Sequence, residues 1–180
     1  MPTYIALLRG INVSGQKKIT MVELRNMLHK MAFNDISTYI QSGNVVFTSD
    51  EKDTVILEAK IKHHIKDTFK FDVPVLVKSK TDFEKIVQQN PYTDPKDLEN
   101  KQVYFVLLQN APNTKNVEAF QKVVYENEKF VIGENCVYLL CKNGYGNAKL
   151  NNNLVERKLK IEATTRNYRT MVKLLEMAGE

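Results

Sequence analysis

The same succession of strand-like and helix-like segments occurs twice in this chain of 180 residues, and that repetition limits the possible folds more than any other feature. The first half reads strand, helix, strand, strand, helix, strand, with segments at 3–9, from Thr20 onward, 36–41, 44–48, about 51–69 and 73–77. Thr20 and Glu23 form the capping-box pattern that begins a helix. This order, β-α-β-β-α-β, predicts a ferredoxin-like unit over residues 1–79.

The second half repeats most of this order after residues 80–100, where we place a short helix capped by Thr81 and a Pro- and Asp-rich linker. Its segments are a strand, a helix, two hairpin strands and a further helix, at 101–109, 113–126, 129–132, 136–141 and about 150–160. The two hairpins have similar sequences, YIQSGNVVF at 39–47 and FVIGENCVY at 130–138, which indicates an internal duplication. In this interpretation the second half lacks a final strand and has a terminal helix at 166–177 instead. The predicted fold class is α+β, with ferredoxin-like halves at 1–79 and 101–180.

The first strand of each half is apolar on both of its faces. In the strand at 3–9, Tyr4, Ala6 and Leu8 point to one face, and Ile5 and Leu7 point to the other. A sheet with helices on one side only would expose one of these faces to water. We therefore expect the second face to be covered, either by the sheet of the other half or by a helix. A terminal helix that crosses to the first half is one arrangement left open.

Composition and residue spacing narrow the class of protein. The chain is 43% hydrophobic, which is enough for one domain or two small ones. No apolar run could span a bilayer and the N-terminus reads as a strand, so we expect a cytoplasmic protein without a membrane partner. Cys136 and Cys141 fit neither a redox pair nor a zinc knuckle, and we expect two buried or half-buried free thiols. His63 and His64 are helix neighbours that cannot share a metal ion, so no metal site is predicted.

The most polar and most basic part of the chain lies near its end. Seven basic residues and two acidic ones between 142 and 169 give that segment a net charge of +5, equal to that of the whole chain. The helix near 150–160 places Asn153, Glu156, Arg157 and Lys160 on one face. Lys149 stands at its N-terminus, where exposed N–H groups favour an anion. We interpret this segment as an anion-binding site, and a capped helix with a solvated polar face is the alternative.

The loop after the first strand has some features of a phosphate-binding loop. Gly10 and Gly15 precede Lys17, but Gln16 separates the second glycine from the lysine and no Ser or Thr follows that lysine directly. These departures argue against a nucleoside-triphosphatase loop. A looser anion-binding loop would use the basic and amide side chains Arg9, Asn12, Lys17 and Lys18. The alternative is a flexible surface loop with glycines at its turns.

Two further polar stretches contain candidate residues. Hairpin turn chemistry explains residues 42–44, whereas it does not require Gln41, which is therefore a candidate polar contact. Thr164 and Thr165 can cap the terminal helix. Arg166 and Arg169 at the start of that helix oppose its dipole. This conflict indicates either a functional role for the arginines or a carboxylate partner elsewhere in the fold.

Three separated motifs carry a family resemblance over essentially the whole chain: TYIALLRGINVSGQKKI at the start, the hairpin YIQSGNVVF, and GNAKLNNNLVERKL followed by ATTRNY. Together they resemble the uncharacterised bacterial family called domain of unknown function 1697. The resemblance implies two ferredoxin-like halves and no established activity, substrate or cofactor. The sequence departs from the family at Ser14, where a glycine is frequent. The recurrent residues of the family correspond here to Arg9, Gly10, Asn12, Lys18, Gln41, Ser42, Gly43, Asn44, Lys149, Asn153, Glu156, Arg157, Thr165, Arg166 and Asn167.

Two functional hypotheses of different class follow, together with a third in which the protein is a structural or oligomerisation module. The first is a protein that binds a phosphate-bearing ligand, either a nucleotide or a short nucleic acid. Its predicted ligand-binding residues are Arg9, Asn12, Lys18, Gln41, Asn44, Lys149, Asn153, Arg157, Arg166 and Asn167. The second is an enzyme in which Glu156, tuned by Arg157 or Lys149, acts as the acid or base. No cofactor is predicted, and the oligomeric state is left open.

Overall fold

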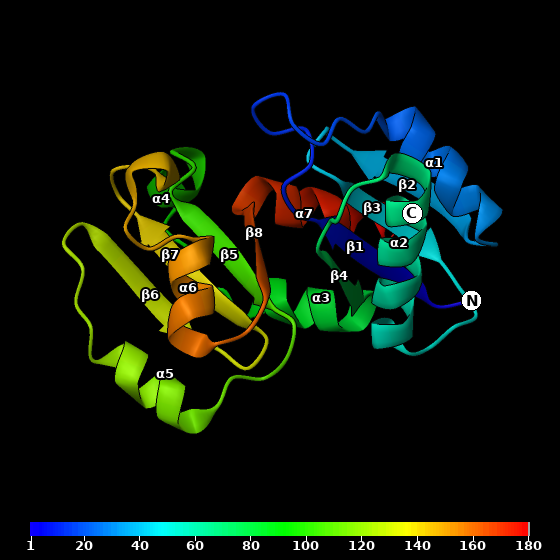
Figure 1. Ribbon diagram of the computed structural model, residues 1–180. Helices are drawn as coiled ribbons and strands as arrows, with labels where there is room; N and C mark the ends of the chain where they lie inside the picture. The colour runs from blue at the N-terminus through cyan, green and yellow to red at the C-terminus, as the bar shows by residue number, and fades with distance from the viewer. Residues whose placement is uncertain (180) are drawn as a thin grey trace. The chain divides into compact units, whose positions relative to one another are not determined.

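The computed structural model describes residues 1–179 and contains two compact units, each built on one four-stranded antiparallel sheet (Figure 1). Unit 1 comprises Met1–Lys85 and the chain from Lys173 onward, and unit 2 comprises Ile86–Val172. The described residues form seven α-helices, so the chain is α+β. None of these helices is long and apolar enough to cross a membrane.

Unit 1 contains the elements predicted for the first half. They are β1 (Thr3–Leu8), α1 (Met21–Lys30), β2 (Asn34–Tyr39), β3 (Asn44–Thr48), α2 (Thr54–Phe69) and β4 (Val75–Ser79), followed by the start of α3 (Lys80–Gln88). The strand order is β2-β3-β1-β4, which places β4 at an edge, as the proline before it predicts. The predicted capping box is confirmed, because the Thr20 side chain accepts a hydrogen bond from Glu23 N and the Glu23 carboxylate accepts one from Thr20 N.

Two local predictions for unit 1 are wrong. The sequence predicts an inner face of Val55, Ile56, Ala59 and Ile65 for α2. The buried face of α2 consists of Leu57, Glu58, Ile61 and Ile65, so Ile65 is confirmed, whereas Val55 is 62% exposed. Several registers of apolar residues are compatible with this sequence, and packing on the sheet selects the one that repeats every four residues. The cap of α3 is Ser79, whose hydroxyl accepts a hydrogen bond from Asp82 N, and not the predicted Thr81.

Unit 2 contains one strand and one helix that the sequence did not predict. Its elements are α4 (Pro95–Glu99), β5 (Val103–Leu108), α5 (Thr114–Gln121), β6 (Glu128–Ile132), β7 (Cys136–Cys141), a short 3-10 helix (Tyr145–Asn147), α6 (Asn152–Leu159) and β8 (Ala163–Asn167). The helix α7 (Tyr168–Met177) begins in this unit. The strand order is β6-β7-β5-β8.

The expectation that the second half lacks its final strand is therefore wrong. Residues 163–167 form β8, which pairs antiparallel with the central strand β5. Thr164 and Thr165 suit an edge strand, but their polarity and their position before a helix favoured a helix cap. The helix at 113–126 is also shorter than predicted, since α5 ends at Gln121 and Val124 is 92% exposed.

The two sheets match in strand order and in hydrogen-bond register. Leu8 N donates to Gly43 O at 2.8 Å, and Leu108 N donates to Asn135 O at 2.9 Å. One residue further along, Arg9 N donates to Pro74 O and Gln109 N to Glu162 O, both at 3.0 Å. In this register Asn44 corresponds to Cys136, because they face Leu7 and Leu107, so the hairpin alignment read from the sequence is displaced by one residue.

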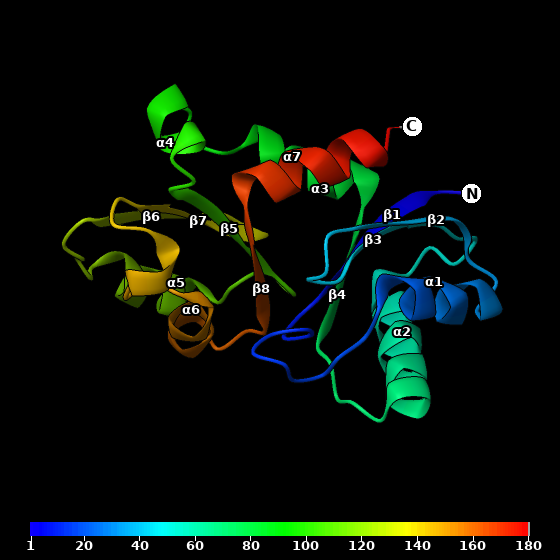
Figure 2. The same cartoon turned by 90° about the horizontal axis from the view of Figure 1, so that it is seen from above.

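Each sheet has helices on one face and buried apolar side chains on the other. Figure 2 shows α1 and α2 on one side of the unit 1 sheet, and α5 and α6 on one side of the unit 2 sheet. Ile5 and Leu7, on the opposite face of β1, are no more than 1% exposed, which confirms that this face is covered. Met177 and Ala178 line a cavity of about 380 Å³ with Val46 on that face, so the end of the chain forms part of unit 1.

Gly43 is predicted to be indispensable to unit 1. Its φ is +81°, and a Cβ atom there would lie 2.6 Å from Leu8 Cβ and 2.9 Å from Ile11 Cδ1. We expect Gly43→Ala to lower the free energy of unfolding by about 2–4 kcal/mol, from backbone strain and overpacking together. Gly10→Ala is the matched control, because Gly10 has a φ of +76° but open space around it. Urea unfolding of both variants would contradict the packing argument if the two losses were equal.

The two cysteines are buried free thiols, as predicted, and Cys141 makes stability depend on alkaline pH. Burial, with a smaller effect of the Glu128 carboxylate, raises the pKa of Cys141 from 9.0 to about 12. The unfolded thiol ionises first, so stability is unaffected below pH 9 and falls by up to about 1.4 kcal/mol per pH unit between pH 9 and 12. Cys141→Val should weaken this dependence in unfolding measured at pH 8, 9 and 10. An unchanged pH dependence would show that Cys141 does not cause it.

Candidate functional site

The polar segment before α6 is an ordered loop built around an inward-pointing tyrosine. Gly144 has φ +81° and ψ 153°, a conformation that essentially only glycine adopts. The ring of Tyr145 stacks on Tyr104 with centroids 4.5 Å apart, and its hydroxyl accepts a hydrogen bond from Asn152 N at 2.9 Å. A Cβ atom at Gly144 would meet nothing within 4 Å, so the backbone conformation there, and not a close approach, requires the glycine.

Backbone donors around the start of α6 are engaged within the protein. Lys149 N and Leu150 N donate to the two carboxylate oxygens of Glu128, at 2.8 and 2.7 Å. Leu154 N donates to the side-chain oxygen of Asn151, which caps the helix. A carboxylate is thus bound where the sequence suggested an anion, and it comes from β6 of the same unit. These donors consequently do not form an open phosphate cradle.

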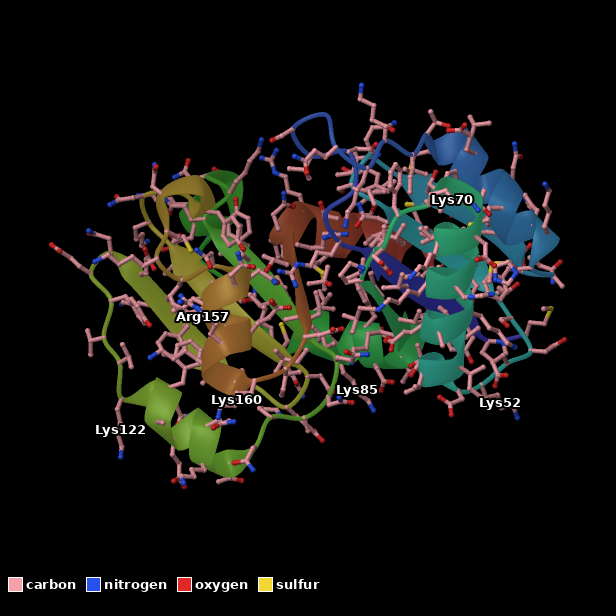
Figure 3. The ribbon with its side chains drawn as sticks, viewed as in Figure 1. Lys52, Lys70, Lys85, Lys122, Arg157 and Lys160 are labelled. Atoms are coloured by element: carbon pink, nitrogen blue, oxygen red, sulfur yellow. The ribbon has the colours of Figure 1, made fainter. Side chains whose placement is uncertain are left out.

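The outer face of α6 is basic and exposed. Asn153 and Arg157 of α6 are exposed, as predicted. Lys160, predicted on the same face, is also exposed but follows the helix as its C-cap, and Figure 3 labels Arg157 and Lys160. Figure 3 also shows Lys122 at the end of α5, the helix beside α6. Within the described part of the chain, none of Lys122, Arg157, Lys158 and Lys160 forms an ion pair. We call Lys122, Arg157, Lys158 and Lys160 the basic face of unit 2.

Glu156 differs from its neighbours on α6. One of its carboxylate oxygens accepts a hydrogen bond from Ala163 N at 2.9 Å, which ties α6 to β8. Unit 1 has a comparable contact, since Glu58 on α2 accepts a hydrogen bond from Val77 N of β4 at 2.9 Å. In both units, a glutamate of the second sheet-packed helix satisfies a backbone donor of an edge strand. This contact gives Glu156 a structural role in unit 2.

The predicted residues of the ATTRN segment lie along β8. The Thr165 hydroxyl donates to the Asn152 amide oxygen at 2.8 Å, while the buried amide nitrogen of Asn152 has no hydrogen-bond partner. Arg166 donates to Thr165 O at 2.9 Å, and burial lowers the pKa of Arg166 to about 10. Asn167 caps α7 by accepting a hydrogen bond from Thr170 N, so the expected threonine cap is wrong. Because Arg166 lies in a strand, the helix-dipole conflict does not apply to it.

In unit 1, Asn12 organises the first loop. Its side-chain nitrogen donates to Ile19 O at 2.8 Å and to Gln41 O at 2.7 Å, and its oxygen accepts a hydrogen bond from Ile19 N at 2.9 Å. The Lys17 ammonium donates to Asp72 O, while Lys18 is exposed. The loop is therefore held at both ends, and Asn12 brings it against the turn that contains Gln41.

Asn44 supports the same turn from inside. It is fully buried, and its amide nitrogen donates to Tyr39 O and to the Ser42 hydroxyl, both at 2.9 Å. Gln41 is exposed. The predicted unit 1 residues thus form one group around the first loop, in which Asn12 and Asn44 hold backbone in place and Lys18 and Gln41 have accessible side chains. Arg9, half-buried, follows β1 at the start of this loop.

The sequence did not indicate a groove of about 320 Å³ between α1 and α2. Only the packing of two helices distant in the chain creates it, so no local pattern could reveal it. The groove is lined by Glu23, Asn26, Met27, Lys30, His64, Thr68 and Phe69.

The described residues contain no group of three His, Cys, Asp or Glu side chains that could hold a metal ion.

Comparison with known proteins identifies the family. The profile described as "Protein of unknown function (DUF1697)" matches residues 1–138. The chain belongs to this family. The DUF1697 protein is also similar to a solved structure, the conserved bacterial protein SP0830 from Streptococcus pneumoniae, with 23% identity, a TM-score of 0.75 and 98% of each chain covered. At this identity the likeness shows a shared fold alone. The search of curated proteins finds no match.

The Glu128 carboxylate is predicted to hold the loop of this DUF1697 protein in place. Glu128→Ala removes the acceptor of two backbone N–H groups, so we expect about 2 kcal/mol less stability and faster hydrogen exchange at the Lys149 and Leu150 amides. Glu126→Ala, an exposed change two residues earlier, is the control. Amide exchange by NMR that is equally slow in both variants would refute this role.

Proposed function

We propose that this DUF1697 protein binds a phosphate-bearing ligand, a short nucleic acid in preference to a mononucleotide, through the basic face of unit 2. The observation that carries the proposal is the unpaired charge of α6 and the loop before it. Residues 149–160 contain four basic side chains and one acid, Glu156, whose carboxylate accepts the Ala163 hydrogen bond. Unpaired lysines and arginines on one surface favour a polyanion, because binding neutralises phosphates and releases their counterions.

The geometry favours an extended ligand over a compact one. A mononucleotide site needs donors that converge on one phosphate, but the N–H groups of Lys149 and Leu150 already bind Glu128. Arg157 instead lies on the exposed face of α6, Lys160 follows the end of that helix, and Lys122 lies at the end of the adjacent helix (Figure 3). Separate charges of this kind suit a chain of phosphates. The unit 1 candidates Arg9, Asn12, Lys18, Gln41 and Asn44 form a separate group around the first loop and are not part of the basic face.

Two alternatives carry distinct expectations. An enzyme with Glu156 as acid or base would lose activity in Glu156→Gln, although the glutamine oxygen can still accept the Ala163 hydrogen bond. If the protein is a structural or oligomerisation module, its role would not depend on the charges of the basic face.

We also propose that the matched registers of the two sheets reflect duplication of one ferredoxin-like unit, with boundaries near 79 and 101, in a cytoplasmic bacterial protein.

Neutralising the basic face tests the proposal. We expect Arg157→Gln with Lys160→Gln to weaken binding of a short single-stranded RNA and to reduce the slope of log K against log salt by about 0.7 per lost phosphate contact. Fluorescence anisotropy at several salt concentrations measures both quantities. Lys52→Gln with Lys62→Gln, two exposed changes of the same charge in unit 1, is the control. Equal affinities and slopes in the two double variants would exclude the basic face as the site.

A further inference from the structure

The loop between α5 and β6, residues 122–127, combines charge with accessible apolar surface. We infer that the nucleic acid is single-stranded and that its bases contact this loop, with Tyr125 as a stacking surface and Val124 as an apolar contact. The inference rests on the proposed function and specifies which kind of nucleic acid the basic face accepts.

Val124 is the first observation. Its side chain is 92% exposed, although removing an apolar side chain such as valine from water is favourable. Along the chain it lies between Lys122, which belongs to the basic face, and Tyr125. An apolar side chain in this position contributes little to binding a phosphate backbone, but it can pack against the flat surface of an unpaired base.

Tyr125 is the second observation. Its ring is half-buried and held beside Phe130, with centroids 6.1 Å apart and ring planes at 69°, and Phe130 itself stacks on Phe120 at 4.5 Å. The backbone of Tyr125 also forms a β-bridge with Glu128. The ring is therefore fixed by the core of unit 2 while part of it stays accessible, so stacking on it requires little loss of side-chain freedom.

The third observation is that this ring and α6 pack on the same core of unit 2. Tyr125 and Phe130 pack against a buried cluster that contains Val155 and Leu159 of α6, the helix that carries Arg157. Consistent with this packing, the Arg157 guanidinium lowers the pKa of Tyr125, although burial and the Glu128 carboxylate raise it more. A phosphate at Arg157 would bring the sugar and base of the same strand toward Tyr125, which is the pairing of groups used by proteins that bind single strands.

A duplex fits these features less well than a single strand does. Its bases are stacked within the helix, so a lone exposed valine and a half-buried tyrosine meet only sugar and phosphate. Stacking of an unpaired base on an aromatic side chain is worth about 1–3 kcal/mol, enough to favour single strands over duplexes. Inorganic polyphosphate carries no base, so the Tyr125 ring adds nothing to its binding.

The test compares three probes by fluorescence anisotropy or competition: an oligonucleotide of about 12 nucleotides, the corresponding duplex, and inorganic polyphosphate. We expect Tyr125→Leu to weaken single-strand binding by about 10-fold and Tyr125→Phe to preserve it. Val124→Ser should weaken it by a few-fold, whereas Val55→Ser, at an exposed valine of unit 1, should not. Polyphosphate binding should be unchanged in all four variants. Because Val124 is almost fully exposed, its variant tests the inference even if Tyr125→Leu destabilises the fold.

The outcomes separate this inference from the proposed function. Selective loss of single-strand binding in Tyr125→Leu and Val124→Ser supports the inference. Equal affinity for the duplex, or no effect of either substitution on single-strand binding, overturns it while Arg157- and Lys160-dependent binding of anions still stands. If the unaltered protein binds none of the three probes at about 50 mM salt, the proposed function fails and the inference fails with it.

Discussion

Each sheet depends on a central strand whose side chains are excluded from water on both faces. From Tyr4 to Leu8 in β1 no residue is more than 3% exposed, and from Phe105 to Leu108 in β5 none is measurably exposed. Full burial of one such side chain contributes about 1.5–3 kcal/mol, so these two strands supply a large share of the hydrophobic stabilisation. They cannot display polar groups, and the chemistry of the molecule is therefore confined to the strand ends, the loops and the outer helix faces.

This constraint explains which parts of the fold were predictable. Strands that are apolar on both faces stand out in the sequence, and so do the capping box at Thr20 and the hairpin turns, because each is a local pattern. The strand β8 carries the sequence ATTRN and was missed, since its identity comes from pairing with β5 and not from its own composition. The inner face of α2 was misassigned for a similar reason, because contact with the sheet decides the register among several apolar candidates.

The candidate site shows the same limit at the level of single hydrogen bonds. The exposed position of Arg157 on α6 follows from helical spacing, whereas Lys160, predicted on the same helix face, is exposed but lies beyond the end of the helix as its left-handed C-cap. The role of Glu128 does not follow from sequence, because its partners Lys149 and Leu150 lie some twenty residues away. Asn12 was predicted as a ligand contact, and it instead joins three backbone segments of unit 1. A polar residue that recurs in a motif can serve either purpose, and only its partners distinguish them.

The matched registers of the two sheets show that equivalent turn positions tolerate substitution to different extents. The carbonyl groups of Gly43 and Asn135 accept equivalent hydrogen bonds from the ends of their central strands. In unit 1 the backbone at this position has φ +81°, and a Cβ atom would collide with Leu8 of β1 and with Ile11 of the following loop. In unit 2, an asparagine occupies the position. Equivalent turns of the two sheets therefore differ in the side chains they can accept, and the two units are free to diverge at different sites.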